Sequence, residues 1–111
     1  MFYLTIILFA LAAILGVVIL KNWLTAGNTS KTVIYGHGLF AAAGLVLLVV
    51  MYLNNPENST RNSLILFGLA AIVGFYMFFR DLKGKFSPTW MAVVHGLVAV
   101  AAFVILLFQV I

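Results

Sequence analysis

Four long apolar stretches dominate the chain, and three short polar connectors separate them. The apolar stretches cover about Phe2–Leu20, Val33–Leu53, Leu64–Phe79 and Trp90–Ile111. A helix needs about 20 residues to cross a hydrocarbon core of about 30 Å, so each stretch can span a bilayer. The 111 residues are 66% hydrophobic and only 7% charged, which is too apolar for a water-soluble domain. We therefore predict an all-α integral membrane protein with one domain, residues 1–111, folded as a four-helix bundle.

The connectors KNWLTAGNTSKT, NNPENSTRNS and RDLKGKFSPT contain all the charged side chains, and their basic residues are unevenly shared. One side of the membrane receives Arg61 alone, and the other receives Lys21, Lys31, Arg80, Lys83 and Lys85. The positive-inside rule places the second side in the cytoplasm, so both termini are predicted outside, in the periplasm of a bacterial inner membrane. The net charge of +4 then reflects topology and contact with the lipid bilayer, and no nucleic acid partner is predicted.

A shift of 58 positions aligns the chain with itself. ILFALAAILG, from Ile7, falls on ILFGLAAIVG, from Ile65, with eight identical residues, and the only two histidines, His37 and His95, coincide. The repeat covers 7–53 and 65–111. Each unit is one helical hairpin, so we predict two parallel-repeat hairpins related by a pseudo-two-fold axis along the membrane normal. This symmetry places both histidines at one depth, in the cytoplasmic half.

Small residues accompany each histidine at helical spacing. Close helix packing explains such residues by themselves, and a lone buried histidine is often only an interhelical hydrogen bond. Ionisable groups within spans are costly, however, and a symmetric pair indicates function. The small residues expected to line the gap between the histidines are Gly16, Ala41, Gly44, Gly74, Ala99 and Ala102.

Two imidazoles on opposite sides of a narrow gap suit a six-coordinate haem iron, whose ring supplies the other four nitrogens. Zinc needs three or four protein ligands, and without cysteine the chain cannot form a disulfide, an iron–sulfur cluster or a covalent haem attachment. We expect the second nitrogen of each imidazole to bond to a backbone carbonyl or a hydroxyl. The candidate partners for the haem propionates are Lys21, Lys31, Arg80, Lys83, Tyr35, Trp23 and Trp90.

This arrangement resembles the haem-binding four-helix bundle of membrane b-type cytochromes. The resemblance implies that His37 and His95 bind the iron of a non-covalent haem b, and that Gly16 and Gly74 let the porphyrin edge approach. Respiratory cytochromes b carry a second histidine about 13 or 14 residues along each ligand helix. Those places are occupied here by Val50, Met51, Phe108 and Gln109, so one haem per chain is expected.

The resemblance implies electron transfer or haem handling near the cytoplasmic face, as a redox component rather than a stand-alone enzyme. A quinone or a redox partner protein would complete the electron path, and the haem could lie within one chain or across a homodimer interface. Two alternatives remain open. A structural or assembly subunit would use its histidines only for hydrogen bonds, and a small four-helix multidrug exporter would need a membrane-embedded glutamate, which no predicted span contains.

Overall fold

The computed structural model describes residues 1–25, 27–85 and 87–109. These residues form four helices and no strand, which confirms the predicted all-α bundle. The helices are α1 (Phe2–Leu24), α2 (Lys31–Asn54), α3 (Asn58–Leu82) and α4 (Thr89–Leu107). Each is long and apolar enough to cross a membrane. The bundle is 42 Å long, close to the thickness of a bilayer with its headgroups, about 40–45 Å.

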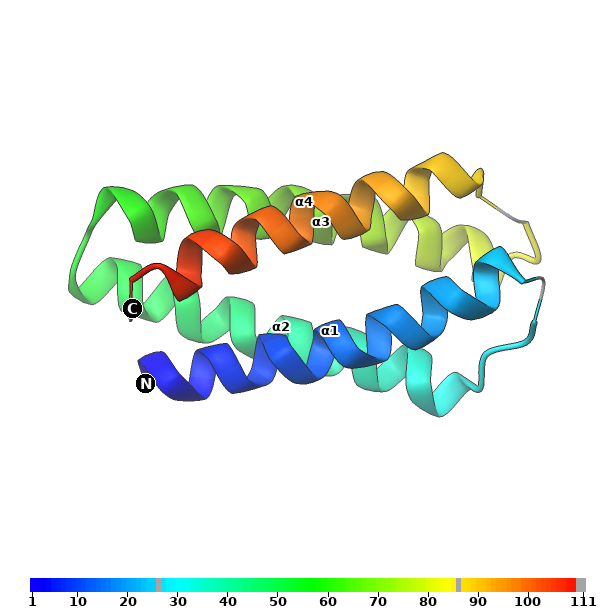
Figure 1. Cartoon of the computed structure of the whole chain (residues 1–111), viewed down its shortest axis with the longest axis horizontal. Coiled ribbons are helices and arrows are strands. Elements are labelled where there is room, and N and C mark those ends of the chain that lie inside the picture. The colour runs from blue at the N-terminus through cyan, green and yellow to red at the C-terminus, as the bar shows by residue number, and fades with distance from the viewer. Residues whose placement is uncertain (26, 86, 110–111) are drawn as a thin grey trace.

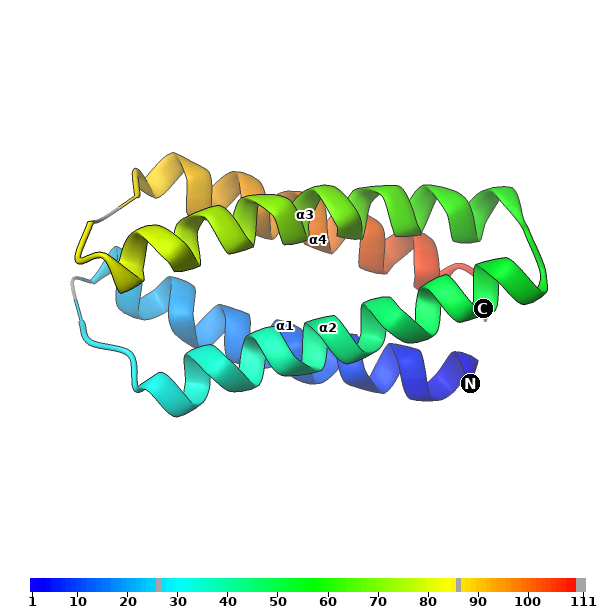
Figure 2. The same ribbon diagram turned by 180° about the vertical axis from the view of Figure 1, so that it is seen from behind.

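The helices pair as two antiparallel hairpins, α1 with α2 and α3 with α4 (Figure 1). The hairpins meet through α1 with α4 and through α2 with α3, so α1 and α3 lie on one diagonal of the bundle and α2 and α4 on the other. Figure 2 shows the same arrangement from behind. Both termini and the α2–α3 connection lie at one end, called here the terminal end. The connections within the hairpins lie at the opposite end, called here the loop end.

The helices extend further into the polar connectors than the sequence predicts. Asp81, expected in a loop, lies exposed in the last turn of α3, and Lys31 begins α2. Hydrogen bonds at the ends explain the limits: the Ser30 hydroxyl caps α2 by accepting from the backbone N–H of Val33. Gly84, with a φ of 73°, follows α3 and donates its N–H to the Asp81 carbonyl.

The fourth helix is shorter than expected. It ends at Leu107, whereas the apolar stretch suggested helix as far as Ile111. Gln109 lies in a turn, where its side-chain oxygen accepts a hydrogen bond from the Thr60 hydroxyl of α3. Residues 110 and 111 lie outside the described part of the chain.

The packed core fills only the terminal half of the bundle. The cluster at its centre consists of Phe9, Leu48, Phe67, Ala102 and Leu106. The rings of Phe9 and Phe67 stack with their centroids 3.8 Å apart and their planes 3° from parallel. In the same half, the buried Ser63 hydroxyl donates to the Ala102 carbonyl and ties α3 to α4.

Candidate functional site: a histidine pair between the hairpins

His37 on α2 and His95 on α4 face one another across a diagonal of the bundle. Their ring centroids are 6.1 Å apart, and the ring planes make an angle of 74°. The two histidines are 58 positions apart in the sequence and belong to different hairpins, so the fold brings the repeat partners to one site. Both side chains are half-buried. The prediction that the repeat pairs the histidines at one depth agrees with this geometry.

Each imidazole is held by the other helix of its own hairpin. Nδ1 of His37 donates to the carbonyl oxygen of Ala12, and Nδ1 of His95 donates to that of Ala70; both distances are 2.7 Å. Ala12 and Ala70 are themselves 58 residues apart, so the repeat covers the hydrogen bonds as well as the rings. The sequence predicts a backbone carbonyl or a hydroxyl as the acceptor, and in both repeats the acceptor is a carbonyl.

The glycines at this level lie against the imidazoles. A Cβ added to Gly16 would be 3.0 Å from Cε1 of His37, and one added to Gly74 would be 2.9 Å from Cε1 of His95. Both distances are shorter than an ordinary carbon contact of about 3.5–4.0 Å. The glycines therefore provide the room in which each ring reaches its carbonyl. The contact that the structure shows is between glycine and imidazole, whereas the resemblance implied a contact between glycine and the porphyrin edge.

The other small residues divide between two levels. Ala41 and Ala99 are half-buried, one turn from the histidines. Gly44 and Ala102 are buried in the packed core two turns away, where the ring of Phe9 would lie 3.1 Å from a Cβ at Gly44. Gly44 and Ala102 thus belong to the packed core rather than to the gap between the histidines where they were expected, and the Phe9 ring occupies the space beside Gly44.

The candidate cationic and polar residues gather at the loop end. Lys21 and Lys31 are exposed, whereas Arg80 is half-buried. An Arg80 Nη1 lies 3.5 Å from the Tyr76 hydroxyl, and the guanidinium lies 5.7 Å from the centre of the same ring. Of the remaining candidates, Trp23 is half-buried, and the exposed ones are Lys83, Tyr35 and Trp90. The structure therefore leaves the lysines accessible and engages Arg80 within α3.

The buried residues of the four helices are confined to the terminal half of the bundle. Among the described helical residues, every buried one lies at or on the terminal side of a layer formed by Ala12, Gly44, Ala70 and Ala102. The histidines lie on the other side of this layer. The imidazoles therefore lie beyond the buried core, in the part of the bundle whose described helical residues are half-buried or exposed.

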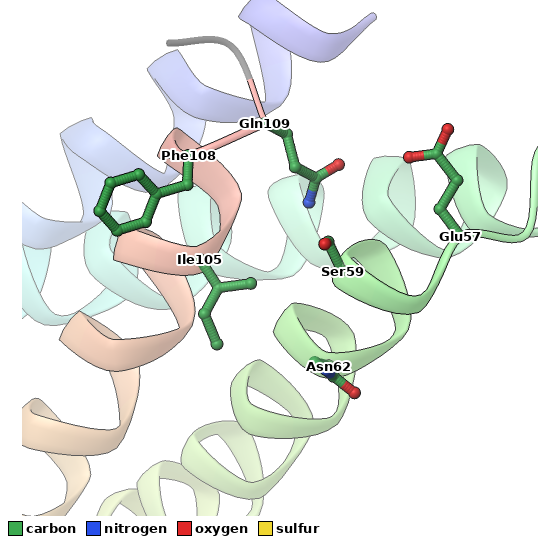
Figure 3. A pocket seen from close by; sticks show the side chains of 6 residues that line it. All are labelled: Glu57, Ser59, Asn62, Ile105, Phe108 and Gln109. Carbon is green, nitrogen blue, oxygen red and sulfur yellow. The ribbon is translucent and has the colours of Figure 1, made fainter.

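Two hollows lie at the terminal end of the bundle, away from the histidines. The larger has a volume of about 540 Å³ and lies between the start of α3 and the end of α4 (Figure 3). The smaller, about 440 Å³, shares Glu57 and Gln109 with it and reaches Met1 and Met51. Neither hollow contains a histidine, and their mixed polar lining is what the ends of spans present to water and lipid headgroups.

The described residues contain no group of three or more His, Cys, Asp or Glu side chains able to hold a metal ion. The sequence predicts both histidines and both glycines of the site, and it predicts a carbonyl or hydroxyl acceptor for each imidazole without identifying Ala12 or Ala70. It does not predict the Phe9–Phe67 pair, although both phenylalanines lie inside the repeated decapeptide. Comparisons with protein-family models, curated proteins and solved structures find no match.

Proposed function

We propose that the chain is a membrane b-type cytochrome in which His37 and His95 hold one haem b for electron transfer or haem handling. The observation that carries the proposal is the 6.1 Å separation of the ring centroids. Metal–nitrogen bonds of histidine are about 2.0–2.1 Å long, so two imidazoles this close together are near enough to hold one shared metal ion.

The hydrogen bonds prepare both rings for a metal. A carbonyl oxygen can only accept, so Nδ1 of each neutral imidazole carries the proton and Nε2 carries a lone pair. Metal-binding histidines characteristically donate their second N–H to a carbonyl or carboxylate, which fixes the tautomer and the ring orientation. Two such imidazoles would hold the iron of one haem.

The donor set also favours haem over a bare ion. Zinc sites use at least three protein ligands, whereas the described residues provide two histidines and no neighbouring carboxylate or thiolate. Haem brings four nitrogens of its own and needs space on each side of the metal. The histidines lie beyond the last buried layer of the helices, where no described helical residue is buried.

The protein would bind, orient and tune the cofactor, and the haem would supply the redox chemistry. His37 and His95 set the coordination, and the surrounding spans exclude water. By the positive-inside rule the loop end faces the cytoplasm of a bacterial inner membrane, so Lys21, Lys31 and Lys83 are available to the propionates there. A quinone or redox partner protein would exchange electrons with a single haem placed in this half.

A second candidate is a structural or assembly subunit without a cofactor. One observation favours it: each histidine already joins two helices through its bond to a carbonyl and fills the space over a glycine. Such bonds stabilise membrane helices by only about 0.6–2 kcal/mol each. The two functions differ in what they predict for haem.

Single and double alanine variants of the histidines distinguish the two functions. In the cytochrome, His37→Ala or His95→Ala should convert a six-coordinate low-spin haem into a high-spin form with weaker retention, and the double variant should lose specific binding. Visible and EPR spectra of protein purified from haem-replete cells measure this change. A double variant with an unaltered low-spin spectrum would remove both residues from the site and refute the proposal.

A further inference from the structure

The stacked pair Phe9–Phe67 occupies the axis between the two hairpins. The rings come from the diagonal helices α1 and α3 and are repeat partners, 58 residues apart. Their centroid distance of 3.8 Å is shorter than the 4.5–7 Å at which aromatic pairs usually lie. The helices therefore hold the rings face to face, and the absence of a Cβ at Gly44 gives Phe9 its place, since three of its ring carbons would lie 3.1 Å from that atom.

The pair closes the bundle on one side of the histidines. Phe9 and Phe67 are buried, with 5% and 8% of their surface exposed. Towards the loop end, the buried layer continues only as far as the alanines whose carbonyls bind the histidines. The stack is thus a complete cross-layer of the core close to the half-bundle that contains the imidazoles.

The imidazoles lie within one to two helical turns of this layer. The His37 ring bonds to the carbonyl of Ala12 and lies against Gly16; these two residues follow Phe9 by three and seven positions, a rise of about 4.5 and 10.5 Å along α1. Phe67, Ala70 and Gly74 repeat this spacing around His95. A flat macrocycle held between the two imidazoles would extend beyond them, and towards the terminal end Phe9 and Phe67 are the first large buried side chains that it would meet among the described residues.

We propose that Phe9 and Phe67 form the floor of the haem site and fix how deeply the macrocycle enters the bundle. This inference rests on the proposed function. The two rings are positioning residues: they contact the edge of the macrocycle without binding its iron. They also separate the haem from the terminal end, where the hollows and polar side chains lie.

The test compares Phe9→Ala and Phe67→Ala with the matched controls Leu48→Ala and Leu106→Ala. The two leucines are fully buried in the same cluster, one turn further from the histidines, so they report a loss of packing alone. Transfer of haem from each variant to excess apomyoglobin measures retention. We expect haem loss to be at least about tenfold faster in the phenylalanine variants and within about twofold of the original chain in the leucine variants. All four should remain low-spin, because both ligands stay in place.

If the alanine variants do not fold, Phe9→Leu and Phe67→Leu replace them, because leucine keeps the core more nearly filled. These variants should also lose haem faster than Leu48→Ala and Leu106→Ala. A second readout uses the unaltered chain: ring protons of selectively labelled Phe9 and Phe67 should shift when the diamagnetic ferrous low-spin haem is bound, through the ring current of the macrocycle. If the chain binds haem, but the phenylalanine and leucine variants lose it at equal rates and the ring-proton signals of Phe9 and Phe67 do not shift, the proposal that these rings form the floor is wrong and the proposed function still stands. A chain that binds no haem overturns the proposed function instead.

Discussion

Gly74→Ala should destabilise the protein relative to Gly96→Ala, although both replace a helical glycine beside the same histidine. A Cβ at Gly74 would lie 2.9 Å from Cε1 of His95 and 3.4 Å from its Nδ1. A Cβ at Gly96 would lie in open space, with no described atom within 4 Å apart from its chain neighbours and the backbone of its own helix. The comparison therefore isolates the contact with the imidazole.

The size of the effect follows from these distances. The His95 ring must retreat by at least about 0.6 Å to restore an ordinary contact of about 3.5 Å, and this movement also lengthens the 2.7 Å bond from Nδ1 to the Ala70 carbonyl. Overpacking of this kind costs about 1–3 kcal/mol. Replacing glycine by alanine in a helix stabilises both variants by about 1 kcal/mol. Gly74→Ala should therefore be about 1–3 kcal/mol less stable than Gly96→Ala.

Reversible unfolding in mixed micelles, followed by circular dichroism on the protein without haem, measures this difference. Gly16→Ala and Gly38→Ala form a second matched pair in the other repeat, with a Cβ at Gly16 lying 3.0 Å from His37 and none of the described atoms near one at Gly38. If Gly74→Ala is as stable as Gly96→Ala, the close packing of imidazole on glycine is refuted.

Two further predictions concern orientation and ligation. A reporter that is active only outside the cytoplasm should be active when fused after Ile111, because the positive-inside rule places both termini outside. If only a reporter that requires the cytoplasm is active at this position, the predicted topology is wrong. His37→Met should keep a six-coordinate haem if the sulfur reaches the iron and should raise its reduction potential, as thioether ligation does; redox titration measures this, and an unchanged potential in a variant that is still six-coordinate would show that His37 is not a ligand.

The hairpin arrangement could be predicted from the sequence because apolar length, charged connectors and the repeat all depend on the order of residues along the chain. Once His37 and His95 are repeat partners on two hairpins that run in the same sense, their common depth follows from helical rise alone. The helix ends were less predictable. Apolar length marks the hydrocarbon core, whereas α3 continues through polar residues such as Asp81 as long as its backbone hydrogen bonds are satisfied.

The neighbours of the small residues could not be predicted from the sequence. Gly16 and Gly44 both look like places where helices or a cofactor approach, yet one lies against an imidazole and the other against Phe9. Which ring fills the space above a glycine depends on the rotation of the facing helix, and helical periodicity does not fix that rotation when almost every position is apolar. The carbonyl of Ala12 carries no side-chain signal at all, so only the structure identifies it as the partner of His37.

The visible spectrum of the protein, purified gently from membranes of haem-replete cells, tests the central claim most directly. The account predicts a coloured protein with about one haem per chain, a sharp Soret band, and split α and β bands after reduction, as expected for a low-spin haem between two histidines. A colourless preparation from such cells, with the chain folded and the Nδ1 bonds of His37 and His95 intact by NMR, would contradict it and leave the histidines as interhelical hydrogen bonds.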